Sequence, residues 1–266
     1  MVSIVTVTYN SDKYIRDTIE SVLNQSYTNY EHIIIDGQST DRTLEIIKAY
    51  QPKYNGRMRW ISEKDDGIYD AMNKGIRMAK GVVIGILHSD DWYDFRALET
   101  LVDNLEEDID IYHGKIYQIS KVGNKYRKRK ANDVDLASIT KKMTIKHTSC
   151  FVSKCWHEKK LYDSSYAISA DYKFILDSYL SGARFKYIDY YFTYMRFGGA
   201  SSINKVTVQK ERYRTQYDLL GRKNVSVLVI NITIIYMVKL ARKILTLFLT
   251  EEGLTDLETR NWEELK

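Results

Sequence analysis

Two adjacent carboxylates, Asp90 and Asp91, follow an apolar run at residues 82–87. Carboxylates fixed side by side repel each other unless a cation joins them. Mg²⁺ and Mn²⁺ prefer oxygen ligands, and in proteins they usually hold the phosphates of a substrate as well. The pair therefore predicts a divalent-metal site, although a solvated loop after a strand would show the same residues.

Asp171 is a further carboxylate whose place in the chain can be predicted. Apolar residues with helical spacing follow Asp171, so it would stand at the start of a helix. The helix dipole also favours a carboxylate there, and position alone favours that structural role.

These side chains need a scaffold that brings distant residues together. Apolar or β-branched runs that fit buried strands lie at residues 2–8, 30–35, 58–62 and 82–87. Segments with helical spacing, such as residues 14–23 and 70–80, lie between them. This alternation indicates an α/β fold with a mainly parallel sheet flanked by helices. Ligands bind at the carboxyl ends of such strands, where Asp36, Asp90 and Asp91 stand.

The sequence lacks the glycine-rich loops that usually hold nucleotide phosphates. No G-x-G-x-x-G follows the first strand, and no G-x-x-x-x-G-K-[ST] occurs. A bound metal would then have to neutralise much of the charge on a phosphate substrate. Arg196, which precedes two glycines after an aromatic strand, is a candidate to pair with phosphate oxygens.

The composition is that of a globular protein with a basic second half. The 266 residues can bury a sizeable core, and the net charge is +5. Cations gather at residues 121–130 and beyond Lys205, which predicts attraction to phosphates or to an anionic membrane surface. No basic and aromatic motif accompanies them, so we expect no nucleic-acid partner. Two cysteines and the lack of a signal-peptide pattern predict a cytoplasmic protein.

Six short motifs resemble, in content and order, those of the family 2 glycosyltransferases, which have the Rossmann-like GT-A fold. They are TVTYN at 6–10, IDGQSTD at 35–41, GIYDAMNKG at 67–75, SDD at 89–91, SADY at 169–172 and GGAS at 198–201. The combination is more specific than any single motif, and it covers residues 1–205. The resemblance implies inverting transfer of a sugar from a nucleoside-diphosphate sugar, with Mn²⁺ or Mg²⁺ on the diphosphate.

The resemblance also implies a role for each matching residue. Residues expected to bind the nucleotide sugar are Thr8, Tyr9, Asn10, Asp36, Asp65, Asn73, Asp90 and Arg196. Asp91, together with Asp90, would ligate the metal, and Asp171 would be the catalytic base. The sequence departs from the family's D-x-D signature at this point and has Ser89-Asp90-Asp91. His147 either lies near the metal and diphosphate, shapes the acceptor pocket, or is a hydrogen-bonded structural residue, and the sequence leaves these readings open.

Residues 206–266 lie outside the resemblance and are expected to form a helical extension of a catalytic domain at 1–205. Residues 225–238 are almost wholly apolar, and three cations follow. This run is shorter than the roughly 20 residues that span a bilayer. We therefore expect a partly amphipathic helix lying in the membrane interface, with packing on the catalytic domain or in a homo-oligomer as the alternative. The acidic residues 251–266 are expected to be a loose terminus.

These features predict a glycosyltransferase of bacterial surface-polysaccharide synthesis (O-antigen, capsule or exopolysaccharide), peripheral at the inner face of the plasma membrane. The donor would be a UDP-sugar, and the acceptor a saccharide carried on a lipid diphosphate. One alternative is a sugar-phosphate nucleotidyltransferase, which would need a glycine-rich basic loop where residues 9–12 stand. The other is a non-catalytic, membrane-docked adaptor with the same fold, and the full set of carboxylates argues against it.

Overall fold

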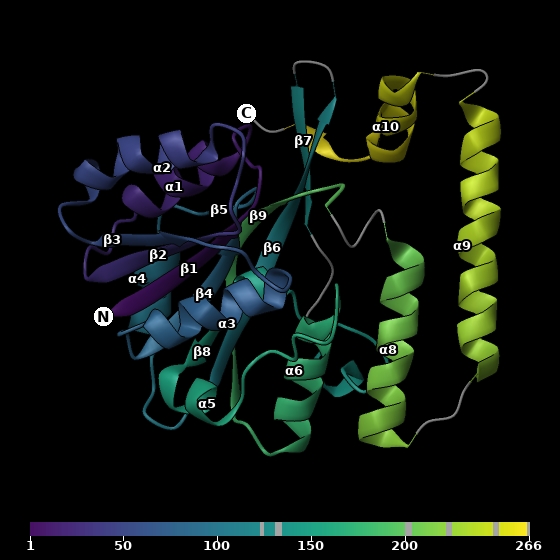
Figure 1. Ribbon diagram of the computed structural model, residues 1–266. Helices are drawn as coiled ribbons and strands as arrows, with labels where there is room; N and C mark the ends of the chain where they lie inside the picture. The colour runs from purple at the N-terminus through teal and green to yellow at the C-terminus, as the bar shows by residue number, and fades with distance from the viewer. Residues whose placement is uncertain (123–124, 131–134, 200–203, 222–224, 247–249, 265–266) are drawn as a thin grey trace.

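A mixed sheet with helices against both faces forms the centre of the molecule (Figure 1). The computed structural model describes the chain except residues 123–124, 131–134, 200–203, 222–224, 247–249 and 265–266. Over the described residues the sheet has ten strands in the order β10-β7-β6-β8-β4-β1-β2-β3, with β9 joined to β5 and β6.

The first half of the sheet is the parallel unit that the sequence predicts. Its strands are β1 (Val2–Thr8), β2 (Tyr30–Asp36), β3 (Met58–Ser62) and β4 (Val83–His88). β1 lies between β2 and β4 and runs parallel to both. Every residue of β1 and β2 is buried, because helices cover both faces. The carboxyl ends of these strands therefore meet at one edge.

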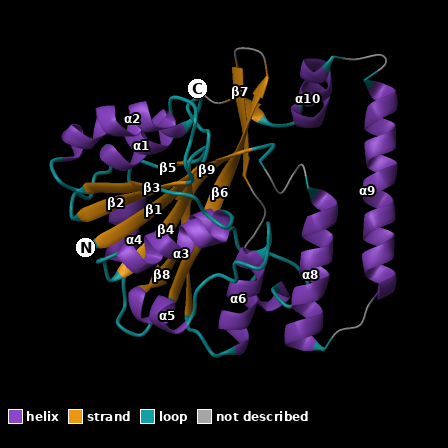
Figure 2. Ribbon diagram, in the orientation of Figure 1, coloured by secondary structure: helices purple, strands orange, loops and turns teal. Residues whose placement is uncertain are grey.

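Two hydrophobic cores lie on opposite faces of these strands, since successive strand side chains point to opposite sides. Ile4 and Ile34 pack on one face with helices α1 (Ile15–Leu23), α2 (Thr43–Tyr50) and α4 (Ala97–Asp103). Val5 and Ile35 pack on the other with α3 (Ile68–Met78), α5 (Lys154–Lys159) and α6 (Ala170–Leu180). Figure 2 shows α1 and α2 on one side of the parallel strands and α3 on the other.

The second half of the sheet is mostly antiparallel. Its strands are β5 (Trp92–Tyr93), β6 (Ile111–Val122), β7 (Lys125–Lys130), β8 (Cys150–Ser153) and β9 (Phe185–Arg196). β8 joins the halves by pairing antiparallel with both β4 and β6, and β6 also runs parallel to β9. β6 and β7 pair antiparallel, and residues 123–124 between them are outside the described residues. Parallel order is thus confirmed for the central strands.

The C-terminal part contains α8 (Lys205–Leu220), α9 (Val225–Leu245), α10 (Glu251–Thr259) and the short strand β10 (Glu263–Glu264). Figure 1 shows α9 as the element farthest from the sheet. α9 is 21 residues long, which is longer than the apolar run at 225–238. The cations that follow this run lie inside the helix and do not end it. The expectation of a run too short to span a bilayer is therefore wrong: by length and composition alone, α9 could cross a membrane.

The end of the chain is docked on the sheet, so the expectation of a loose terminus is also wrong. β10 pairs with β7, and Asp256 forms an ion pair of 2.6 Å with Arg127. Leu254 is 2% exposed, and the ring of Trp262 packs against Phe197 and the Arg129 guanidinium. Sequence spacing gave no signal of these contacts, because their partners lie more than 60 residues upstream.

Candidate active site

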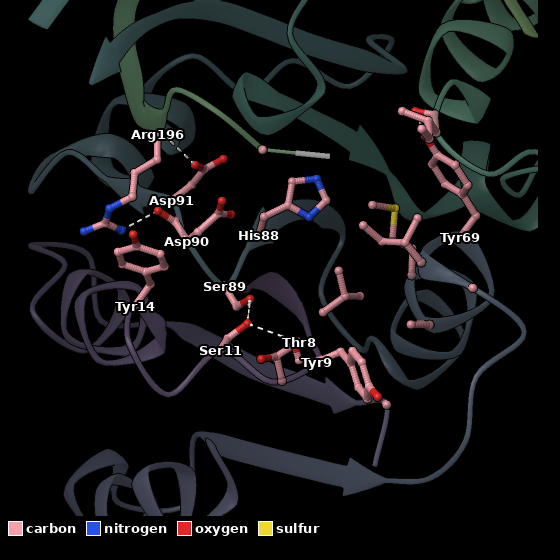
Figure 3. A pocket seen from close by; sticks show the side chains of 18 of the residues that line it. Thr8, Tyr9, Ser11, Tyr14, Tyr69, His88, Ser89, Asp90, Asp91 and Arg196 are labelled. Atoms are coloured by element: carbon pink, nitrogen blue, oxygen red, sulfur yellow. Dashed lines mark hydrogen bonds between the residues drawn. The ribbon is translucent and has the colours of Figure 1, made fainter. Parts of the chain in front are cut away.

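A cavity of about 860 Å³ opens at the carboxyl ends of β1 and β4. Its wall includes the loop after β1, the loop after β4, the start of α3, the start of α6 and the end of β9. Figure 3 shows Asp90 and Asp91 near Arg196 at one end of the cavity and Tyr69 at the other. The geometry thus joins segments that are far apart in the sequence.

Asp90 and Asp91 lie where the sequence predicts them, directly after β4 and on the cavity wall. Asp91 is 2% exposed and accepts a hydrogen bond of 3.0 Å from the backbone N–H of Arg196. Burial raises the pKa of the Asp90 carboxyl. Burial, and next the charge of Asp90, raise the pKa of Asp91 well above its ordinary value. The pair is therefore costly to ionise in the absence of a cation.

The donor set of this pair fits a hard divalent ion. Asp91 is buried and Asp90 partly buried, and a cation between two such adjacent carboxylates would relieve their repulsion. Over the described parts of the chain, no three His, Cys, Asp or Glu side chains are grouped to hold a metal by themselves. Mg²⁺ and Mn²⁺ sites commonly use one or two carboxylates and complete their shell with substrate phosphates and water. Asp90 and Asp91 match that pattern.

Arg196 lies against the carboxylate pair, but its guanidinium already has protein partners. It donates to the backbone oxygen of Asp90 and to the carboxylate of Asp17. It also lies between the rings of Tyr14 and Trp92, 4.4 and 4.6 Å from their centroids. Arg196 is thus positioned by its neighbours at the cavity wall, where its charge faces the same region as Asp90.

Thr8, Tyr9 and Asn10 line the cavity at the end of β1. The hydroxyl oxygen of Thr8 is buried and has no hydrogen-bond partner, which leaves it available to a ligand. Tyr9 is 63% exposed. The Asn10 side chain accepts a hydrogen bond of 2.8 Å from the backbone N–H of Thr40, so it braces the loop after β1 against the loop after β2.

Three more residues were predicted to contact the nucleotide. Asp65 lies on the cavity wall, whereas Asp36 and Asn73 do not. Asp65 is on the wall and pairs with Lys74 at 2.6 Å. Asp36 is fully buried, and its carboxylate accepts from the hydroxyl groups of Ser39 and Ser62. The Asn73 amide makes hydrogen bonds of 2.8 and 3.0 Å with the backbone of Tyr162. The structure does not bring Asp36 or Asn73 to the wall, because chain partners occupy both side chains.

Asp171 lies in the first turn of α6, on the cavity wall, with its side chain 18% exposed. Its Oδ2 is 3.0 Å from Nδ1 of His147, and its Oδ1 accepts the backbone N–H of Tyr172 at 2.8 Å. Burial opposes ionisation of Asp171. Hydrogen bonds from His147 and from the backbone N–H of Tyr172 oppose this effect, however, and the pKa of Asp171 lies below its ordinary value. The carboxylate is therefore kept charged, as a general base requires.

His147 contacts the predicted base, and its other ring nitrogen contacts His88. The two Nε2 atoms of His147 and His88 are 2.6 Å apart. His88 ends β4 and lines the cavity, one residue before Ser89. Sequence reasoning missed His88. The only available signal was a histidine that ends an apolar strand, and that signal does not name a partner 59 residues away.

Glu211 is a second residue that sequence reasoning missed. It lies on α8, and its carboxylate accepts three backbone N–H groups, from Ala167, Ile168 and Ser169, at 2.6, 3.0 and 2.8 Å. These residues directly precede α6, the helix that carries Asp171. An anionic side chain at a helix start satisfies donors that the helix leaves unpaired. α8 therefore contacts and orders the segment that presents Asp171.

Comparisons with known proteins agree with this geometry. The chain is 30% identical over 219 residues to the chondroitin synthase of Escherichia coli, an alignment that covers 80% of this chain and 31% of that protein. It is 30% identical over 198 residues to the uncharacterized glycosyltransferase MJ1057 of Methanocaldococcus jannaschii, covering 71% of this chain and 68% of that one. The chain thus spans about a third of the length of the first relative.

Two solved structures show the same fold. Staphylococcus aureus TarS 1–349 in complex with UDP has a TM-score of 0.63 at 20% identity, over 81% of this chain and 64% of that one. The mannosyltransferase PcManGT of Pyrobaculum calidifontis, in complex with GDP-Man and Mn²⁺, has a TM-score of 0.62 at 12% identity, over 84% and 65%. These likenesses confirm the GT-A fold.

The family is shown by the sequence itself. Residues 3–166, more than half of the chain, match the family model described as glycosyl transferase family 2. The matched region runs from β1 through the segment after α5 and includes the adjacent carboxylates. This chain belongs to glycosyltransferase family 2.

Proposed function

We propose that the protein transfers a sugar from a nucleoside-diphosphate sugar, most simply a UDP-sugar, to a saccharide acceptor with inversion. The observation that carries this proposal is one cavity with two adjacent carboxylates at one end, of which Asp91 is buried, and a separate ionised carboxylate at the other. Leaving-group stabilisation and proton removal need two such sites on opposite sides of a reacting carbon. TarS in complex with UDP and PcManGT in complex with GDP-Man and Mn²⁺ share this fold.

The proposed reaction uses Asp171 as the only base. The acceptor O–H bond breaks and its proton passes to Asp171, while the acceptor oxygen forms a bond to the anomeric carbon. The bond from that carbon to the diphosphate breaks, and its electron pair leaves with the nucleoside diphosphate. Asp90 and Asp91 would hold a divalent ion, which neutralises charge on the leaving group. One displacement, with no second carboxylate as nucleophile, inverts the configuration.

Other residues of the cavity would bind and orient the donor. Thr8 offers a free hydroxyl and Tyr9 an exposed ring at the end of β1, where the nucleoside would lie. Asp65 stands on the same wall. Arg196 would add positive charge beside the diphosphate. Gly199 leaves room there, since a Cβ atom on it would lie 3.9 Å from the Asp90 carboxylate.

The acceptor and the cellular setting belong to the same proposal. We propose residues 1–205 as the catalytic domain and residues 206–266 as an extension, and a saccharide on a lipid diphosphate as the acceptor in surface-polysaccharide synthesis. None of the described side chains of α9 is buried, and the helix has cations at positions 239, 242 and 243 but no acidic residue. α8 and β10, which flank it, both contact the same sheet-and-helix body. A helix tethered at both ends to one body fits the surface of a membrane on the cytoplasmic side, because spanning would separate its ends.

A panel of nucleotide sugars, tested for thermal stabilisation with and without Mn²⁺, checks the donor half of the proposal. A ligand at about 100 times its dissociation constant adds about 2.7 kcal/mol. In a chain of this size that energy raises Tm by roughly 5–10 °C. We expect this increase for one nucleotide class, and only with the metal present. If no nucleotide sugar raised Tm under either condition, a non-catalytic role would replace this one.

A further inference from the structure

We propose that His88 is a positioning residue that holds the ring of His147 in place and, through it, the orientation of Asp171. The inference rests on the proposed function, because it gives His88 a part in the same reaction. Three segments supply the chain of contacts: the end of β4, the turn before β8 and the first turn of α6. The contacts run from His88 to His147 and from His147 to Asp171.

The hydrogen bond to Asp171 determines where His147 carries its proton. An ionised carboxylate only accepts hydrogen bonds, so Nδ1 of His147, 3.0 Å from Oδ2 of Asp171, must carry the hydrogen. A neutral imidazole with its hydrogen on Nδ1 has a lone pair on Nε2. That lone pair faces Nε2 of His88 at 2.6 Å. His88 must then carry its hydrogen on Nε2 and donate it to His147.

His88 is suited to this task by its place at the end of β4, where the strand backbone fixes its ring against that of His147, with the ring centroids 4.7 Å apart. With its hydrogen on the other ring nitrogen, two lone pairs would face each other at 2.6 Å, and His147 would turn away from Asp171. Protonation of His147 would reverse the polarity of the contact between the histidines and leave the chain of hydrogen bonds intact.

The contact between the two histidines affects the orientation of the Asp171 carboxylate. Tyr172 and His147 each donate one hydrogen bond to Asp171, to different oxygens, so the plane of the carboxylate is set from two sides. The Tyr69 hydroxyl also lies 3.5 Å from Oδ1, so the second lone pair of Oδ2 is the one left for the acceptor hydroxyl. A misplacement of about 1 Å in a reacting group can cost about 100-fold in rate. His88, which touches neither reactant in this proposal, would affect the rate through that alignment.

The same strand end serves both halves of the reaction. β4 ends in His88, and the next residues are Ser89, Asp90 and Asp91. The hydroxyl of Ser89 is 2.8 Å from that of Ser11, which secures this turn to the loop after β1. The same stretch of backbone therefore positions both His88, which contacts His147, and the carboxylates Asp90 and Asp91. The turn after β4 sets the distance between them.

Two amide substitutions test this assignment, because each amide replaces one ring nitrogen. Glutamine places its NH₂ group near the position of Nε2, whereas asparagine reaches only the position of Nδ1. We expect H88Q to keep kcat within about 3-fold of the wild type and H88N to lower it about 10-fold to 100-fold. KM for the donor, and the Tm shift caused by UDP with MnCl₂, should stay the same in both. H113Q is the control: His113 is a buried histidine outside the cavity wall, and its replacement should leave kcat unchanged.

A double variant separates positioning from a loss of folding. In an Asp171→Asn background H88N should lower the residual kcat no further, because His88 acts only through Asp171. Equal kcat values for H88Q and H88N, or additive losses in the double variant, would overturn the assignment. If the wild type itself turned over no donor, the proposed function would fail, and that outcome is distinct from a failure of this inference.

Discussion

Asp91 is the residue whose environment most requires a cation. It is almost fully buried next to Asp90, and burial and that neighbour raise its pKa. Asp91→Ala should abolish the part of the Tm increase with UDP that depends on Mn²⁺, because phosphates and one carboxylate hold the ion less tightly. Scanning calorimetry with and without MnCl₂ measures this. Asp108→Ala, which removes an exposed carboxylate, is the control and should keep the full increase. A full increase in Asp91→Ala would exclude this residue as a ligand.

His32 predicts how stability depends on pH. It is fully buried in β2, and burial lowers its pKa from 6.5 to about 3. Between these values the unfolded chain binds a proton that the folded chain does not. The free energy of unfolding therefore falls on acidification, by about 1.4 kcal/mol per pH unit for this one group. Urea unfolding at pH 7.5, 6 and 5 measures the slope.

The variant His32→Gln tests the origin of that slope. The His32 ring lies 2.9 Å from the hydroxyl groups of both Thr6 and Tyr54, so glutamine keeps a polar group there. The variant should lose stability at pH 7.5 but show a shallower decline toward pH 5. An unchanged slope would mean that other buried histidines, such as His113 and His157, carry the effect.

At the residue level, the sequence predicted which carboxylates lie on the cavity wall better than it predicted the hydrogen-bond partners of each side chain. The strand-end argument placed Asp90 and Asp91 on the cavity wall, because parallel strands bring their carboxyl ends together, and the family resemblance placed Asp171 there. It also assigned Asp36 and Asn73 to the nucleoside. Their hydrogen bonds go to Ser39, Ser62 and Tyr162, and residue type cannot distinguish a carboxylate or amide that faces a ligand from one that faces the chain.

At the scale of elements, α8 supports the start of α6 through Glu211. Three charge-assisted hydrogen bonds from backbone N–H groups end on its carboxylate. Glu211→Ala leaves these donors without a partner, which should cost about 2–3 kcal/mol and lower Tm by roughly 4–12 °C. kcat should fall as well, because Asp171 follows this segment directly. Calorimetry and a UDP-release assay measure the two effects.

Two other substitutions on α8 sharpen this prediction. Glu211→Gln keeps acceptor oxygen at the same reach and should lose less stability than Glu211→Ala. Lys210→Ala changes an exposed neighbour and should lose almost none. Equal Tm values for Glu211→Ala and Lys210→Ala would show that α8 does not order the start of α6.

The sequence predicted the elements that have a regular pattern and missed the way they dock. Alternating apolar strands and helices gave the parallel half, because its periodicity is local. The contact of α8 with α6, and of β10 with β7, depends on residues 42 or more positions apart and leaves no periodic trace. The predicted boundary after residue 205 falls just inside α8, which begins at Lys205 and contacts the segment that carries the base.

At the scale of the molecule, α9 contacts α8 on one side and leaves much of its apolar surface exposed over the described residues. We expect the protein to float with vesicles that contain phosphatidylglycerol and to be released by carbonate at high pH, as a helix lying on the surface would be. The double variant Ile234→Glu with Met237→Glu should abolish flotation, because both side chains are more than half exposed on α9. Leu257→Glu, on exposed surface of α10, is the control and should float. Retention after carbonate would indicate a spanning helix, and a dimer that does not float would indicate a homo-oligomer contact.

Turnover of the donor by Asp171→Asn tests the central claim most directly. Asparagine keeps the shape of the side chain but cannot take a proton from the acceptor hydroxyl. With the nucleotide sugar that stabilises the wild type most, we expect kcat to fall about 100-fold to 10,000-fold. The Tm increase with that donor and Mn²⁺ should stay within about 1 °C of the wild-type increase. Wild-type turnover by Asp171→Asn would contradict the assignment of Asp171 as the base, and with it the mechanism proposed for this cavity.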